Sequence, residues 1–216
     1  DEGNQYANLF LFDYYNDIES NVGKRVCYIQ QACKNFDIFP LKKLIYYCCI
    51  TGSNSIATYF TKEMIHHLLN LNSYESDILY FQGIVLSNKD LCKIFEVKHN
   101  GALALEKFLY VYIDKPDFAN KNIVVLIGKL YEEGNGAKKD LEKALYYYEL
   151  YNKDSIRAIN LRKRINDEKE QKYRNVNNKK IIEKYFNYDF DDYLNKNPEF
   201  SLMINERYFS LNSEEL

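Results

Sequence analysis

Apolar and polar residues recur along this chain with the period of an α-helix, and the pattern is clearest between residues 123 and 152. Two stretches there place apolar or small residues on one helical face. The first stretch comprises Ile123, Ile127, Gly128 and Tyr131, and the second comprises Leu141, Ala144, Leu145 and Tyr148. The spacing therefore predicts two helices that share one buried interface.

The residues between these two stretches predict a turn. Gly134 and Gly136 can adopt the left-handed backbone conformation that ends a helix, and the Asp140 side chain can cap the next one. Gly128 and Ala144 lack bulk, so the two helices can cross closely at these positions. The segment is therefore predicted to form an αα-hairpin.

This hairpin pattern resembles the Sel-one-like repeat, a relative of the tetratricopeptide repeat. The positions that match the repeat signature are Gly128, Tyr131, Gly134, Gly136, Asp140, Lys143, Ala144 and Tyr148. The chain departs from it at Ile123, Ile127 and Tyr147, where the family has alanine, leucine and tryptophan, and it lacks an alanine pair near Tyr151 and Asn152. The resemblance implies an all-α fold of αα-hairpin repeats stacked as a short right-handed solenoid, acting as an adaptor without a cofactor.

A weaker copy of the same pattern precedes the clear repeat, at about residues 78–115. Residues 106–112 echo residues 142–148 at a distance of about 36 residues, which is the size of one helical repeat. Residues 78–83 echo the first helix of the clear repeat at a larger distance, which indicates an insertion of about nine residues. We expect this insertion to form a long polar loop from Asn88 to Asn100.

The N-terminal third is predicted to be helical by periodicity, as a degenerate form of the same repeat. Gly23, Pro40 and Gly52 are expected to separate the helices there. The four predicted helices are residues 9–15, 26–33, 41–50 and 56–71.

A charged helix is predicted after the clear repeat, over residues 155–173, with Ile156, Ile159 and Ile165 as its apolar stripe. Such a helix suits the polar outer end of a repeat array. The tail that follows mixes aromatic and acidic residues. We expect the tail to cap the last repeat, with occupation of the protein's own groove or self-association as alternatives.

These elements predict one helical-repeat domain over residues 1–216. Its parts are the degenerate N-terminal helices (1–72), the Sel-one-like repeats (73–153), the capping helix (154–180) and the C-terminal segment (181–216).

The charge balance argues against partners that need a strong electrostatic field. The chain has 29 Lys and Arg residues against 31 Asp and Glu, a net charge of −2 at pH 7. We therefore expect no nucleic-acid partner, and the mixed charges at residues 157–170 fit a solvated helix. No apolar run approaches the length of a bilayer span, so we also expect no membrane insertion.

The cysteines favour a reducing compartment. There are five of them, an odd number, and most lie in apolar helical stretches, where cysteine behaves as a small hydrophobic residue. We therefore expect free thiols and a cytoplasmic protein. The chain begins at Asp1 rather than at methionine, so a secreted or periplasmic protein is the alternative.

Residues that could support catalysis or metal binding have simpler interpretations. His66 and His67 point about 100° apart on a helix, which prevents them from gripping one metal ion, and we expect them at the helix surface. Cys92 and His99 lie in the predicted loop without an orienting third group. The acids within residues 189–192 lack the glycine and glutamate of a calcium-binding loop. We expect no catalytic site, no metal and no cofactor.

Tyrosine occurs 21 times and tryptophan not at all. Consecutive helical residues point about 100° apart, so Tyr147 and Tyr148 fit the core while Tyr146 is left to line the concave surface. Exposed tyrosines are favoured at protein interfaces. The candidate partner-binding residues are Tyr110, Tyr112, Tyr146 and Tyr151. The alternative is that the tyrosines reflect composition alone.

Together these features predict a non-catalytic scaffold or adaptor that binds a protein or peptide on its concave face. A narrower version is a dedicated inhibitor or immunity-type protein that blocks one partner. The alternatives are the interaction module of a larger protein and an enzyme on a helical scaffold, with Cys92, His99 or the acids of residues 189–192 as its chemistry.

Overall fold

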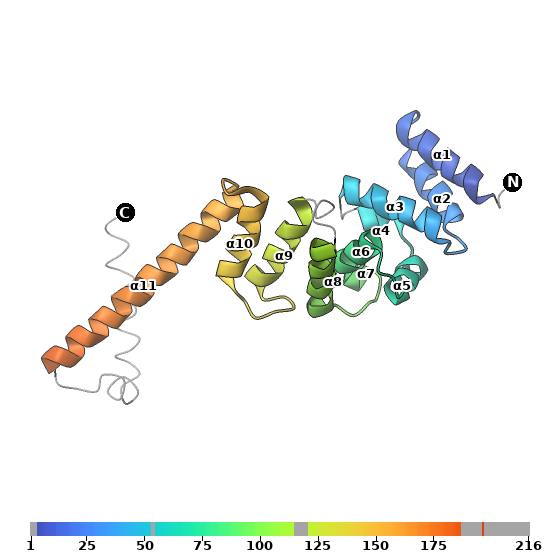
Figure 1. Cartoon of the computed structure of the whole chain (residues 1–216). Coiled ribbons are helices and arrows are strands. Elements are labelled where there is room, and N and C mark those ends of the chain that lie inside the picture. The colour runs from blue at the N-terminus through green and yellow to red at the C-terminus, as the bar shows by residue number, and fades with distance from the viewer. Residues whose placement is uncertain (1–3, 53–54, 115–120, 187–195, 197–216) are drawn as a thin grey trace. The chain divides into compact units, whose positions relative to one another are not determined.

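The computed structural model describes residues 4–52, 55–114, 121–186 and 196, and these ranges contain helices but no strand (Figure 1). The all-α prediction is confirmed. The helices are α1 (Gln5–Asp17), α2 (Val22–Ala32), α3 (Ile38–Thr51), α4 (Ile56–Tyr59), α5 (Lys62–Asn70), α6 (Ser76–Ser87), α7 (Lys89–Ile94), α8 (Gly101–Asp114), α9 (Lys121–Glu133), α10 (Leu141–Asn152) and α11 (Ile156–Phe186).

The chain divides into two compact units, residues 1–161 and 162–216, and α11 begins in the first unit and continues into the second. None of the described helices is both long and apolar enough to cross a bilayer. The predicted boundaries at residues 72, 153 and 180 remain predictions.

Two of the three expected helix separators in the N-terminal third lie inside helices instead. Gly23 is in the first turn of α2. Asn21 is the N-cap of this helix, and its side chain accepts a hydrogen bond from the backbone N–H of Lys24. Pro40 is buried in the first turn of α3, where its fixed φ fits a helix and its missing N–H costs no hydrogen bond. Gly52 ends α3 as predicted, with a φ of 100°.

The helix predicted over residues 56–71 is broken in two. Phe60 takes an extended conformation after α4, and the Thr61 hydroxyl then accepts a hydrogen bond from the backbone N–H of Met64 at 3.3 Å. Both Phe60 and Met64 are buried. Periodicity did not reveal the break because the apolar spacing continues across it.

The two predicted hairpins are present, since α6 packs against α8 and α9 packs against α10 (Figure 1). The segment between α6 and α8 is not the polar loop that we expected. It contains α7, which is capped by Asn88 and buries Leu91 and Cys92, with Phe95 buried just beyond its end. Its apolar residues are too few to show a helical period, so the prediction failed there.

Buried apolar residues form two clusters, and α6 contributes to both. Ile78, Phe81 and Val85 of α6 join the cluster built with α1 to α5 and α7. Leu79 and Leu86 of α6 join the cluster built with α8 and α9. A helix that is apolar on all sides is expected to lie inside a domain, and α6 does so.

Glycines allow close helix crossings in both hairpins. A methyl group at Gly128 would lie 2.6 Å from Cε1 of Tyr148 and 3.1 Å from the carbonyl oxygen of Ala144, so the predicted crossing point is confirmed. In the other hairpin a methyl group at Gly83 would lie 2.6 Å from Cε1 of Phe108. Each glycine thus makes room for a buried aromatic ring of the partner helix.

The turn between α9 and α10 has the predicted chemistry. Gly134 and Gly136 have φ values of 68° and 94°, and the Asp140 carboxylate accepts a hydrogen bond from the backbone N–H of Lys143 at 2.9 Å. Side chains at Gly136 or at Gly101 would overlap across the contact between this turn and the start of α8. The turn of the α9–α10 hairpin therefore packs directly against the start of α8 in the preceding hairpin.

The apolar stripe predicted on α11 is partly wrong. Ile156 and Ile159 are 79% and 47% exposed, whereas Ala158 and Leu161 are buried in the first unit and Ile165 is buried as expected. The buried face is set by Ala158, which is too small to weigh in a hydrophobic pattern. The tail beyond Phe186 lies outside the described residues, except Lys196.

Candidate functional site

A groove runs between α3, α6 and α9 in the first unit. It consists of two adjoining cavities of about 690 Å³ and about 340 Å³, which share Cys49, Tyr80 and Asn122 as lining residues. Residues of α4, the start of α7 and the turn residue Asn135 complete the larger cavity. No described residue of α8 or α10 lines either cavity.

The sequence of α9 explains why it presents one face to the groove. The lining residues of α9 in the larger cavity recur with helical spacing, and they are Asn122, Val125, Leu126, Lys129, Leu130 and Glu133. Ile127 is fully buried in the core on an adjacent face, whereas Ile123 is buried in the same core and also lines the smaller cavity. α9 is thus amphipathic, with its mixed polar and apolar side toward the groove.

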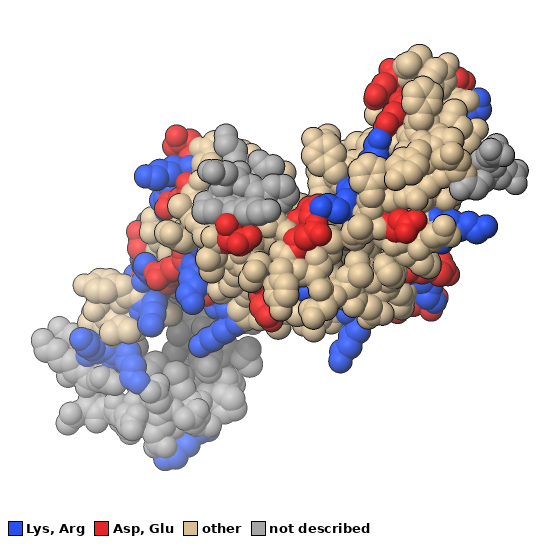
Figure 2. Space-filling view, turned by 45° about the vertical axis from the view of Figure 1, so that its right-hand side comes forward, with Lys and Arg blue, Asp and Glu red and all other residues tan. Residues whose placement is uncertain are grey.

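The polar groups around the larger cavity are mostly amides and balanced charges. Lys129 and Glu133 form an ion pair at 3.6 Å, one helical turn apart. Asn135 Nδ2 donates to the carbonyl oxygen of Ser87 at 3.4 Å, and the Asn88 side chain caps α7. Figure 2 shows the same mixture on the visible face, where acidic and basic side chains lie next to one another at several places.

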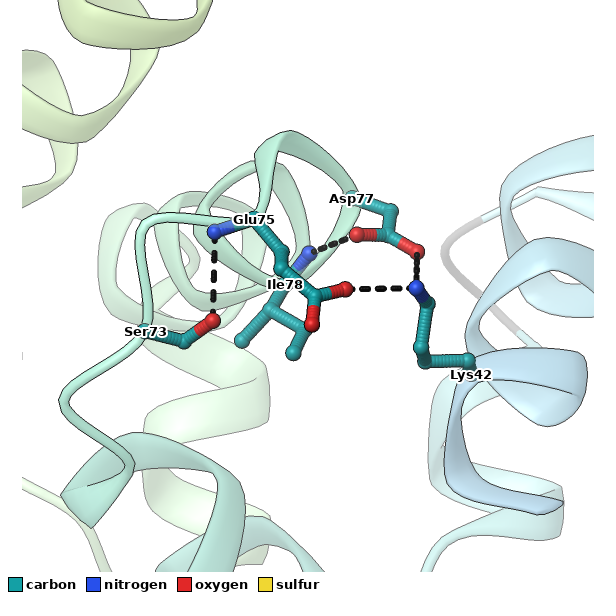
Figure 3. Close-up of polar contacts among 5 residues, drawn as sticks. All are labelled: Lys42, Ser73, Glu75, Asp77 and Ile78. Carbon is teal, nitrogen blue, oxygen red and sulfur yellow. Dashed lines mark hydrogen bonds and ion pairs between the residues drawn. The ribbon is translucent and has the colours of Figure 1, made fainter. Parts of the chain in front are cut away.

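A charged cluster lines the smaller cavity, where α3 meets α6 (Figure 3). Lys42 Nζ lies 2.5 Å from Glu75 Oε2 and 3.5 Å from Asp77 Oδ2. The hydrogen bond to Glu75 is the main reason why the pKa of Lys42 is raised. The Ser73 hydroxyl accepts from the backbone N–H of Glu75, and Asp77 Oδ1 accepts from that of Ile78.

Cys48, Cys49 and Tyr80 line the groove and are neutral at physiological pH. Burial raises the pKa of Cys48 to about 12, and burial together with the charge of Asp77 raises the pKa of Cys49 to about 11. Burial and the neighbouring Cys49 raise the pKa of Tyr80 to about 12. These groups can donate hydrogen bonds and make apolar contact, but the thiols are not activated nucleophiles.

We predict that Cys48 and Cys49 are alkylated much more slowly than Cys27, which is exposed. At about pH 7.5, iodoacetamide should modify Cys27 at least about a hundredfold faster than Cys48 or Cys49, because burial and a raised pKa both suppress reaction. Peptide mass spectrometry over a time course measures the three rates. If Cys49 reacts as fast as Cys27, the groove thiol is more accessible and more acidic than described.

The tyrosines predicted to bind a partner lie on α8 and α10, away from the groove. Tyr110, Tyr146 and Tyr151 are 42%, 57% and 38% exposed. Tyr112 is half-buried and packs edge-on against Tyr147, and its role in partner binding stays a prediction. None of the four lines either cavity, and the prediction that Tyr146 lines a concave surface stays a prediction.

Residues of the predicted repeat signature make contacts within the α9–α10 hairpin. Tyr148 is buried as predicted, and its hydroxyl donates to Glu132 at 2.8 Å. Tyr147 is only partly buried and stacks on Tyr131, with 5.8 Å between the ring centroids. Lys143 lies over the ring of Tyr131 at 5.3 Å. The signature thus forms a contact network between α9 and α10.

Three of the described residues considered for catalysis or metal binding, Cys92, His66 and His67, contact other parts of the fold. The Cys92 thiol is buried in α7 and donates to the carbonyl oxygen of Val85 at 3.2 Å, and burial raises its pKa. His66 and His67 are half-buried rather than at the surface, since His66 Nε2 lies 3.0 Å from the Phe95 carbonyl oxygen and His67 stacks on Phe36. His99 has a buried Nε2 without a hydrogen-bond partner.

Within the described ranges no group of three or more His, Cys, Asp or Glu residues could hold a metal ion. The acids of residues 189–192 lie outside these ranges.

Sequence reasoning missed the groove residues of α3 and α6. Lys42 and Cys49 were seen only as parts of a helix, and the partners Glu75 and Tyr80 lie more than thirty residues away in the chain. The one available signal was on α9, where Asn122, Val125 and Lys129 share a face that the core does not use.

No family model matches this chain, and comparisons with curated proteins and with solved structures find no match either.

Proposed function

We propose that this protein is a non-catalytic interaction module that binds an extended segment of a partner polypeptide in the groove between α3, α6 and α9. The observation that carries the proposal is the pair of adjoining cavities, which together form an elongated site rather than one closed pocket. An elongated site suits a polypeptide chain better than a compact small molecule.

The lining chemistry supports a polypeptide occupant. Ile84, Val125 and Leu126 provide apolar surface for side chains, and Asn122 and Tyr80 provide groups that can hydrogen-bond to peptide N–H and C=O groups. The amide of asparagine both donates and accepts, so it can satisfy either backbone group. This combination allows an extended backbone to enter without leaving its polar groups unpaired.

The proposal includes the finer architecture that the repeat resemblance implies. The α6–α8 and α9–α10 hairpins would be two Sel-one-like repeats of a short right-handed solenoid, and the first helix of each would line its concave side. Support comes from the glycine at each helix crossing and from the contact between the Gly136 turn and Gly101. An adaptor of this kind requires no cofactor.

The test is peptide selection against the full chain, using a displayed library of random peptides about 12 residues long. We expect selected peptides to bind the wild-type protein and to lose at least about a hundredfold in affinity with Val125→Arg, since the new guanidinium would fill the groove with an unpaired charge. Val125 belongs to neither buried cluster, so the fold should tolerate the change. Fluorescence anisotropy measures the affinities.

The matched control is Ile113→Arg, which places the same side chain on an exposed position of α8 outside the groove. It should leave peptide affinity within about twofold. A library that yields no binder, or binders equally affected by both variants, would contradict groove binding.

A further inference from the structure

The smaller cavity of the groove has the features of a receptor for one long side chain. Its volume is about 340 Å³, and its apolar walls come from Ile45 and Ile50 of α3 and Ile123 of α9. The Tyr46 ring stands beside them and is largely exposed. Such walls can cover an aliphatic stem, but they leave the polar end of the occupant to the charged residues at the rim.

The charged residues at that rim carry an excess of negative charge among the described residues that line the cavity. Glu75 and Asp77 share the single positive charge of Lys42. Lys42 bonds Glu75 through Oε2, and Figure 3 shows Glu75 Oε1 directed away from that bond, with no dashed line to it. A third carboxylate stands nearby, because the Ser76 hydroxyl donates to Asp114 at 3.4 Å.

We propose that the smaller cavity receives a lysine or arginine side chain of the bound polypeptide, with its charge at Glu75 and Asp77. This inference rests on the proposed function, because it assigns specificity to the same groove. The stem of the basic residue lies along Ile45, Ile50 and Ile123, and its cationic end meets the carboxylates and the Tyr46 ring. An acidic side chain would face a local net negative charge, and an apolar one would desolvate two carboxylates that share only the charge of Lys42.

The experiment compares variants that break the same ion pair from opposite sides. Peptides selected against the full chain are sequenced, and the affinity of one binder is measured for Glu75→Gln and for Lys42→Met. We expect Lys or Arg to be enriched at one peptide position. Glu75→Gln should weaken binding by about fivefold, whereas Lys42→Met should strengthen it by about threefold, as an exposed charge pair is worth up to about a fivefold change.

The opposite signs of the two affinity changes distinguish direct recognition of the peptide from an effect on the stability of the protein. Both substitutions remove the Lys42–Glu75 contact, so a purely structural cluster would give changes of the same sign. Glu106→Gln on the exposed side of α8 is the matched control and should leave affinity unchanged. Replacing the enriched basic residue of the peptide by norleucine should abolish the difference between wild type and Glu75→Gln.

The outcomes also distinguish this inference from the proposed function. Binders that are lost with Val125→Arg but show no basic preference, or that respond with the same sign to Glu75→Gln and Lys42→Met, would overturn the basic-residue site while leaving groove binding intact. The absence of any groove-dependent binder would overturn both.

Discussion

Gly136→Ala is expected to lower the free energy of unfolding by about 3–4 kcal/mol, because two costs add. The backbone of Gly136 has a φ of 94°, which an alanine side chain tolerates poorly, and the added methyl group would overlap the backbone of Gly101 at the start of α8. Backbone atoms cannot move aside as a flexible side chain can. The turn would have to separate from the preceding hairpin.

A series of the same substitution separates these two costs. Gly52 has a φ of 100° but open space around it, so Gly52→Ala should cost only about 1 kcal/mol. Gly23 lies in the first turn of α2 with nothing closer than 3.6 Å, so Gly23→Ala should be neutral or stabilising by up to about 1 kcal/mol. Urea unfolding followed by circular dichroism measures all three. A Gly136→Ala protein no less stable than Gly52→Ala would show that the contact with Gly101 is not tight.

Phe108→Ala is expected to cost about 3–5 kcal/mol, the usual range for truncating a buried phenylalanine. The Phe108 side chain is fully buried in the second cluster, packs on Gly83 of α6 and lies at a tilt to the Tyr80 ring. Its removal leaves a cavity at the crossing of the α6–α8 hairpin. Tyr110→Ala, two residues further along α8 at an exposed position, is the control and should cost less than about 1 kcal/mol.

The contact between Gly83 and Phe108 also predicts that the effect of Gly83→Ala on stability has opposite signs in the wild-type and Phe108→Ala proteins. In the wild-type protein the new methyl group would lie 2.6 Å from the Phe108 ring, so the substitution should destabilise despite its better helix propensity. In the Phe108→Ala background the ring is gone, and Gly83→Ala should stabilise by about 1 kcal/mol. A double-mutant cycle from denaturant unfolding measures this coupling. Additive effects would mean that Gly83 and Phe108 do not touch.

These substitutions also bear on the groove. Asn135 lies between the two glycines of the turn and lines the larger cavity, and Tyr80 of the crossing helix α6 lines both cavities. Stability at the hairpin crossings and the shape of the groove therefore depend on the same helices. Peptide affinity should be measured only for variants that remain folded.

Local signals in the sequence were sufficient for the clear hairpin. Helical periodicity, two glycines at positive φ and an aspartate cap act within a few residues of one another, so α9, the turn and α10 could be predicted without knowledge of the rest. The close crossing at Gly128 and Ala144 followed from their small size. The failures occurred where local signals were weak, as in the six-residue α7, or silent, as at the break after Phe60.

The sequence by itself determined that the chain is helical, that residues 123–152 form a hairpin, and that Tyr148 is buried while Tyr146 is not. Only the tertiary structure decided where the groove lies. Its walls come from α3, α6 and α9, and contacts such as Lys42 with Glu75 join residues 33 positions apart. Helical periodicity shows which face of each helix is buried, but it carries no information about which other helix covers that face, because long-range packing depends on the shapes of all the helices together.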